Sequence, residues 1–193
     1  ERPVLPLRVA RAMEKKFIIN STDTTLPNSN ALGVVTSAYL NDATAIAQGT
    51  GVNQRIGRKV YLSSIQWKAH FDASGGEDAT ALRLTLIYDK SCDTGDTEPT
   101  IADMFTANSF TALMNPNNYD RFLVLYDCIV NVPSASLSCN HVHEHFMKLK
   151  KMTMYNQAGT ALTSGGLLLV VGQVGLANAQ TLRWTCKLSY YDA

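Results

Sequence analysis

This 193-residue sequence lacks the features of a membrane protein and of a polycation. No apolar run approaches the roughly 18 residues of a membrane-spanning helix. The longest run, 167–171, has glycine on both sides, so we expect no membrane partner. The formal net charge is only +1, so any attraction to a polyanion must come from how the charges are distributed. The chain begins with Glu1 rather than Met, and we expect that residues preceded it.

Cysteine is scarce and scattered, with no C-x-x-C pair, so we expect reduced structural thiols rather than a disulfide framework. The four cysteines are Cys92, Cys128, Cys139 and Cys186. Motifs of enzymes that bind nucleotides or form acyl intermediates are also missing. The glycines of residues 49–57 match neither the Walker nor the dinucleotide-binding pattern, and no serine lies in G-x-S-x-G. We expect no cofactor.

The clearest positive signal is an alternation of apolar and polar side chains over residues 58–71. A period of two predicts a long strand with one buried face. The predicted inner face holds Tyr61, Ile65, Trp67, Ala69 and Phe71, with Ser63 as its polar exception. The predicted outer face holds Arg58, Ser64, Gln66, Lys68 and His70. The three glycines of residues 49–57, just before this strand, predict a tight turn or a close backbone approach.

Seven further segments have strand-like patterns, and no strand–helix alternation is present, so the chain is predicted to be all-β. The eight strands, B to I in chain order, are residues 15–21, 34–40, 58–71, 81–89, 121–132, 143–155, 167–174 and 181–191. The irregular region 90–120 is predicted to contain one short helix within 100–113, with Thr100 as N-cap and Asp103 at its third position. Such a long connection favours a sandwich over an up-and-down barrel. We predict an eight-stranded antiparallel jelly-roll sandwich with B-I-D-G and C-H-E-F sheets.

Two parts of the chain are expected: an extended N-terminal arm, 1–14, and a single jelly-roll domain, 15–193. In the B-I-D-G order, most basic residues of strands B, D, G and I share the outer face of one sheet. Acidic residues instead concentrate between 72 and 127. This segregation suits a protein that holds a polyanion on one side, although a charged strand face can also simply be solvated.

Three stretches carry a resemblance to a known family: GTGVNQRIGRKVYLSSI (49–65), LRLTLIYDK (82–90) and NPNNYDRFLVLYD (115–127). They resemble capsid proteins of small circular single-stranded DNA viruses, and satellite plant-virus capsids are similar. The resemblance implies a virion protein without catalytic activity that assembles with itself into an icosahedral shell of about sixty copies. It also implies a lumenal B-I-D-G sheet, a single-stranded genome, expected to be DNA, and a host nucleus or cytoplasm as the place of assembly. The resemblance does not identify a host receptor.

The residues expected to bind nucleic acid come from the arm and from the basic sheet. The arm departs from the family pattern, because it carries three arginines rather than a dense basic run. The predicted residues are Arg2, Arg8, Arg11, Lys15, Lys16, Arg58, Lys68, Lys148, Lys150, Arg183 and Lys187.

An enzyme is the alternative prediction. His141, His143 and His145 alternate along one predicted strand, so their imidazoles could converge on a metal as in the cupins. Glu144 falls between two of them, which breaks the cupin spacing. We therefore expect surface or interface histidines and no metal, and histidines at a subunit contact would make assembly sensitive to pH.

Overall fold

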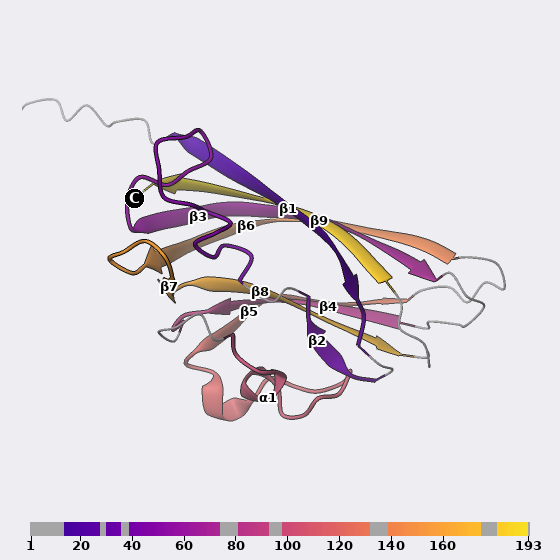
Figure 1. Cartoon of the computed structure of the whole chain (residues 1–193). Helices are drawn as coiled ribbons and strands as arrows, with labels where there is room; N and C mark the ends of the chain where they lie inside the picture. The colour runs from indigo at the N-terminus through magenta and orange to yellow at the C-terminus, as the bar shows by residue number, and fades with distance from the viewer. Residues whose placement is uncertain are drawn as a thin grey trace, which may run out of the picture.

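The computed structural model describes residues 14–27, 30–35, 39–73, 81–92, 98–131, 139–174 and 181–192, which form two antiparallel sheets packed face to face (Figure 1). The first, here called the basic sheet, has the order β1-β9-β3-β6-β7. The second, here called the covered sheet, has the order β2-β8-β4-β5. The first sheet consists of β1 (Lys15–Thr25), β9 (Thr181–Asp192), β3 (Lys59–Ala73), β6 (Cys139–Tyr155) and β7 (Leu162–Ser164). The second consists of β2 (Leu32–Val34), β8 (Gly166–Val174), β4 (Ala81–Asp89) and β5 (Phe122–Asn131).

These orders are the predicted B-I-D-G and C-H-E-F sheets, so the jelly roll is confirmed. Several elements differ from the sequence prediction, and among them β1 continues to Thr25 and β6 already begins at Cys139. The strand predicted at 34–40 is β2 at Leu32–Val34, the short β7 was not predicted, and the helix predicted within 100–113 is the single turn α1 (Ile101–Met104). Its start is as predicted, since Thr100 and Asp103 form a reciprocal capping box.

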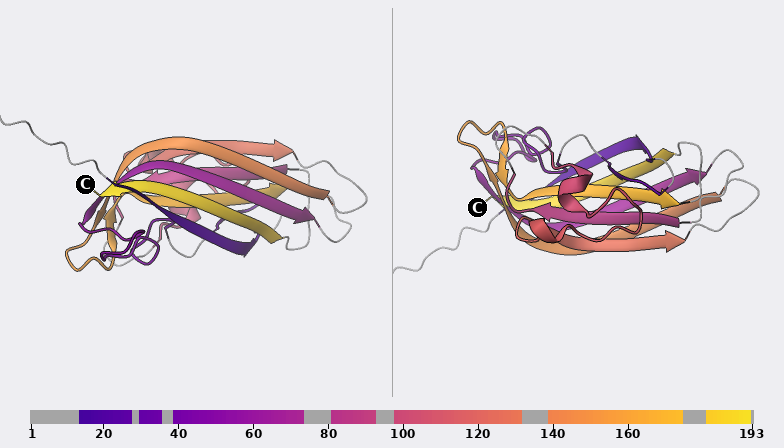
Figure 2. Two further views of the ribbon diagram at one scale, coloured as in Figure 1. Left: turned by 90° about the horizontal axis from the view of Figure 1, so that it is seen from above. Right: turned by 90° about the horizontal axis from the view of Figure 1, so that it is seen from below.

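The two sheets differ in sequence pattern because one is covered on both faces and the other on only one. Strands β4 and β8 are buried along nearly their whole length, because the core lies on one face and residues 98–121 cover the other. We call residues 98–121 the insertion. Figure 2 shows α1 and its neighbouring loops crossing the covered sheet, whereas the strands of the basic sheet lie open on the opposite side. The alternating pattern of β9 agrees, since its inner residues are buried and most of its outer residues are exposed or half-exposed, with the small Ser189 as the exception.

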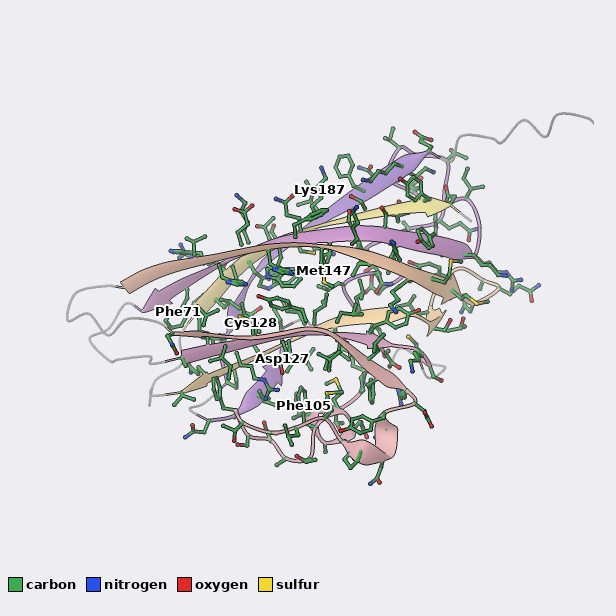
Figure 3. The ribbon with its side chains drawn as sticks, turned by 180° about the vertical axis from the view of Figure 1, so that it is seen from behind. Phe71, Phe105, Asp127, Cys128, Met147 and Lys187 are labelled. Atoms are coloured by element: carbon green, nitrogen blue, oxygen red, sulfur yellow. The ribbon has the colours of Figure 1, made fainter. Side chains whose placement is uncertain are left out.

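Arg83 fastens the insertion to the covered sheet. Its Nε and Nη2 atoms donate to the two carboxylate oxygens of Asp127 at 2.9 and 2.7 Å. Its Nη1 atom donates to the carbonyl oxygens of Phe110 and Ala112, both at 2.8 Å. Burial alone would raise the pKa of Asp127, but hydrogen bonds from Arg83 and Thr85 hold it below its usual value. Figure 3 shows Asp127 and Phe105 on this side of the sandwich.

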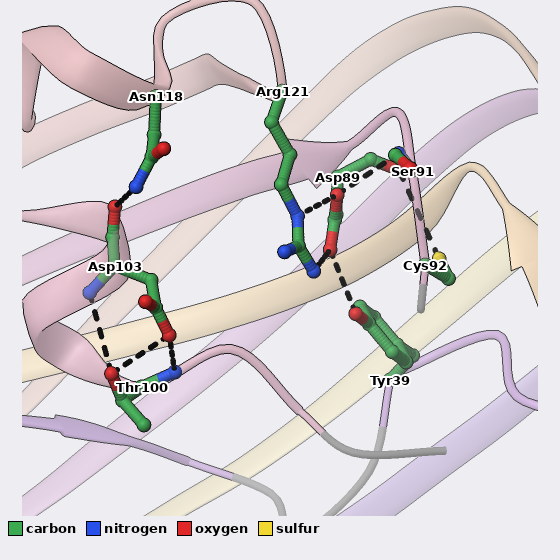
Figure 4. Close-up of polar contacts among 8 residues, drawn as sticks. All are labelled: Tyr39, Asp89, Ser91, Cys92, Thr100, Asp103, Asn118 and Arg121. Atoms are coloured by element: carbon green, nitrogen blue, oxygen red, sulfur yellow. Dashed lines mark hydrogen bonds and ion pairs between the residues drawn. The ribbon is translucent and has the colours of Figure 1, made fainter. Parts of the chain in front are cut away.

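A second polar network holds the end of β4 (Figure 4). The fully buried Asp89 accepts hydrogen bonds from Arg121 Nε and Nη2 at 3.0 and 2.9 Å. Its carboxylate also accepts from the Tyr39 hydroxyl at 2.8 Å and from the Ser91 amide at 3.0 Å. These donors satisfy the buried carboxylate oxygens, and the network ties Arg121, at the end of the insertion, to the end of β4.

The glycine-rich segment before β3 folds around Arg55, which is fully buried. Its guanidinium donates to the carbonyl oxygens of Ile46, Gly57 and Gly159 at 3.0, 2.8 and 2.6 Å. It also lies 3.8 Å from the centre of the Tyr155 ring. Gly49 and Gly51 allow the predicted close approach, because a Cβ at either position would collide with the side chain of Gln54.

Candidate nucleic-acid interface

The open face of the basic sheet is built from aligned rows of side chains. In an antiparallel sheet, residues opposite one another share a face, so the register of β1, β9, β3 and β6 defines the rows. From one end of the strands to the other they are Lys15–Tyr191–Tyr61–Met152, Phe17–Ser189–Ser64–Lys148, Ile19–Lys187–Gln66–Phe146, Ser21–Thr185–Lys68–Glu144 and Asp23–Arg183–His70–Val142. The label on Lys187 in Figure 3 marks this open side.

The first three rows carry cations without acids. They contain Lys15, Lys148 and Lys187, all exposed, and no Asp or Glu. Two further lysines, Lys59 and Lys150, are exposed near the same end of β3 and β6. The positive potential of these rows is therefore not cancelled within the described part of the sheet.

The last two rows are electrically balanced. Lys68 Nζ lies 3.1 Å from Glu144, and Arg183 Nε lies 3.6 Å from Asp23. Hydrogen bonds from Lys68 and Gln66 lower the pKa of Glu144, so this acid remains charged beside its partner. A hollow of about 660 Å³ lies over these rows, but the two strong cations in its lining, Lys68 and Arg183, are the paired ones. Contacts to phosphate here would first have to break an ion pair.

One predicted binding residue lies on the wrong face. The side chain of Lys16 is only 5% exposed, and its Nζ donates to the Gln54 carbonyl oxygen and to Asp192, both at 2.7 Å. It points into the sandwich because it shares the parity of buried Ile18, so it is corrected from the predicted set. Arg58 lies exposed just before β3. Arg2, Arg8 and Arg11 lie outside the described residues.

The structure also brings to this face one aromatic residue, Tyr61, that the sequence pattern placed on the other. Tyr61 was predicted to face the core, but a register irregularity between Leu62 and Ser64 reverses the parity there. Tyr61 therefore faces outward beside Tyr191, with ring centres 6.5 Å apart. The signal was present as Ser63, the polar exception in the predicted inner face, because an extra residue in a strand pair shifts every side chain before it.

Two of the histidines proposed for the alternative function, His143 and His145, line the inner side of β6. The hydroxyl of Tyr126 lies 3.0 Å from Nε2 of His143, and the ring centre of His145 lies 4.1 Å from that of Tyr126. Burial lowers the pKa of His145. These rings pack β6 against β5, and no group of three metal-ligating side chains was found among the described residues. The side chain of His141 is not among those described.

The comparisons with known proteins give one family. A family model described as satellite tobacco necrosis virus coat protein matches residues 9–193. No curated protein matches. No helix of the described chain is long and apolar enough to cross a membrane.

Three similar solved structures are of viral proteins. Desmodium yellow mottle tymovirus is 12% identical with a TM-score of 0.34, covering 100% of this chain and 95% of that chain. A 60-mer BFDV capsid protein is 9% identical with a TM-score of 0.34, covering 93% and 91%. Cucumber leaf spot virus is 11% identical with a TM-score of 0.32, covering 95% and 55%.

Proposed function

Because this chain belongs to the satellite tobacco necrosis virus coat protein family, we propose that its basic sheet lines the inside of a viral shell and holds the packaged nucleic acid. It is a capsid protein and a component of the virion, with a structural rather than an enzymatic role. The proposed shell is icosahedral and contains about sixty copies in its simplest form.

The observation that carries the proposal is the uncancelled charge of the three rows with Lys15, Lys148 and Lys187. A polyanion attracted by such a face releases counterions when it binds, and needs no particular base sequence. The insertion, which carries the described acids Asp103 and Asp120, crosses the covered sheet (Figure 2). With the basic sheet inward, these acids face away from the genome, on the outer or intersubunit side of the particle.

Contacts between copies of the chain are expected at apolar side chains that are exposed in the single subunit. At the tip of the loop around Arg55, Val52 is 77% exposed and Ile56 is 67% exposed. Neighbouring exposed apolar side chains on a loop that is held rigidly from below suit burial against another copy.

The nature of the genome follows from the resemblance to circular single-stranded DNA viruses, so we propose single-stranded DNA, assembled in the host nucleus or cytoplasm. Nucleic acid extracted from purified particles decides this. Digestion by a DNA-specific nuclease supports the proposal, and digestion by ribonuclease alone would replace DNA with RNA and leave the rest standing.

The binding surface is tested by single lysine variants. Each phosphate contact removed lowers the log–log salt slope of affinity by roughly 0.7 for a single strand. We expect Lys148→Ala and Lys187→Ala each to show this loss. Lys90→Ala is the matched control, because Lys90 is exposed at the end of β4 in the covered sheet. Lys68→Ala should lose less, because Lys68 is already paired with Glu144. Equal losses in all four variants would show that the basic sheet is not the binding surface.

A further inference from the structure

We propose that the aromatic side chains among the unpaired lysines form a base-stacking platform, so that the protein holds unpaired nucleotides more tightly than duplex. This inference rests on the proposed function and specifies what the basic sheet selects. The platform consists of Tyr61, Tyr191, Phe17 and Phe146, all on the open face of the first three rows.

The rings are arranged to receive flat partners. Tyr61 and Tyr191 face each other across β3 and β9 with their planes inclined by 34°. Phe17 lies diagonally next to them and is 39% exposed, with Lys187 Nζ 4.5 Å from its ring centre. Phe146 is 58% exposed at the far side of the sheet. Stacked bases and the cations for their phosphates are thus supplied by neighbouring positions.

The open face of the basic sheet exposes more large apolar side chains than is usual for a sheet face that only contacts solvent. Of the eleven large apolar side chains exposed among the described residues, six lie on the open face of β1 and β6. They are Phe17, Ile19, Val142, Phe146, Met152 and Met154. A merely solvated face would alternate inner apolar residues with outer polar ones, so this concentration indicates a ligand with apolar surface of its own. Nucleobases have such surface, and phosphates do not.

The same geometry distinguishes single strands from duplex. In a duplex, the faces of the bases are covered by their neighbours, and only the phosphates can reach the lysines. An unpaired strand presents both groups. Strands lie about 4.8 Å apart and successive outward residues about 7 Å apart, so a base on Tyr61 or Tyr191 leaves its phosphates near Lys15, Lys148 or Lys187. Ser64 and Ser189, between Phe17 and Lys148, add no long side chain over the middle of the sheet.

The experiment compares a thymidine DNA oligonucleotide with a DNA duplex of equal phosphate number, each titrated against full-length dissociated subunits over a range of salt. Wild type should bind the single strand more tightly at every salt concentration. Tyr61→Ala with Tyr191→Ala should lose roughly 5- to 150-fold in single-strand affinity per base unstacked, with the salt slope unchanged. Affinity for the duplex should stay the same.

Two controls match this variant. Tyr119→Ala removes a tyrosine that is 57% exposed on the insertion, over the other sheet, and should change neither affinity. Tyr61→Phe with Tyr191→Phe keeps the rings and should retain the preference. If the alanine variant does not fold, photocross-linking of a 5-bromouracil oligonucleotide to wild type replaces it, and the cross-links should map to β1, β3, β6 and β9.

The outcomes separate the two proposals. Equal affinity for both probes, or an alanine variant with wild-type affinity, overturns the platform while lysine-dependent binding leaves the proposed function standing. Cross-links confined to the insertion overturn it as well. A wild-type protein that binds neither probe overturns both.

Discussion

Replacing Arg83 by methionine should destabilise the whole subunit, although Arg83 is one cation among many in the sequence. Methionine nearly preserves the side chain's length and removes all four hydrogen bonds that Arg83 donates. An unsatisfied buried acceptor costs about 1–3 kcal/mol, and loss of one partner from a buried ion pair about 3–5 kcal/mol. Because Asp127 is 37% exposed and can recover water, we take the lower end, about 3 kcal/mol.

Urea unfolding of dissociated subunits measures this loss. With a slope of about 2–3 kcal/mol per molar urea, the midpoint should fall by roughly 1 to 1.5 M. Lys148→Ala, which removes an exposed lysine of the opposite sheet, serves as the control and should leave the midpoint unchanged. Hydrogen exchange should show where stability is lost, with faster exchange across the insertion. An unchanged midpoint for Arg83→Met would refute the view that this arginine anchors the insertion.

The pH dependence of stability provides a second test of the Arg83–Asp127 pair. Burial opposes ionisation of Asp127, but its bonds from Arg83 and Thr85 prevail and lower its pKa. A carboxyl with a lowered folded-state pKa contributes stability above its unfolded value, about 3.9. That contribution disappears as the pH falls through the lowered pKa. The difference between wild type and Arg83→Met should therefore narrow in acid.

Three further outcomes are expected. Arg55→Met removes the hydrogen-bond donor of three carbonyl oxygens and should cost about 3 kcal/mol of unfolding free energy. Calorimetry should show this as a melting temperature lower by about 6–12 °C. Val52→Asp with Ile56→Asp should leave subunits folded by circular dichroism but unassembled by light scattering; normal particles would remove this loop from the contact. Gly166→Ala should cost about 1–3 kcal/mol through overpacking, whereas Gly33→Ala, where a Cβ meets only ordinary contacts, should cost little in the same urea titration.

The strands and most of their buried faces were predictable because apolar parity is a local property that each strand displays by itself. Residues 181–191 alternate without exception, and the structure buries the predicted side chains Leu182, Trp184, Cys186 and Leu188. The start of α1 was predictable for the same reason, because a capping box needs only Thr100 and Asp103. Features that depend on one segment alone were therefore accessible.

The face of Lys16 was not predictable from its own strand. Phe17, Ile18 and Ile19 are consecutive apolar residues, so they do not decide which parity of β1 faces the core. The inward orientation of Lys16 depends on residues far away in the sequence. Its ammonium group donates hydrogen bonds to the Gln54 carbonyl oxygen and the Asp192 carboxylate. Lysine is tolerated inside because its charge is paired there and its stem is apolar.

The same limit explains why the lysines, Tyr191 and Phe146 could be assigned to the open face from the sequence and Tyr61 could not. A row across the sheet depends on the register of four strands, and the irregularity between Leu62 and Ser64 changes that register in the middle of β3. With regular pairing, Tyr61 would be buried and would leave Tyr191 without an aromatic partner. The irregularity brings Tyr61 to the face that already carries Tyr191, Lys15 and Lys187. Lys68 and Arg183, which the sequence made equal members of the basic surface, are instead set against Glu144 and Asp23 by the same register. Strand pairing therefore determines what the basic sheet can bind. In the three rows without ion pairs, an unpaired nucleic-acid strand can contact both lysines and aromatic rings.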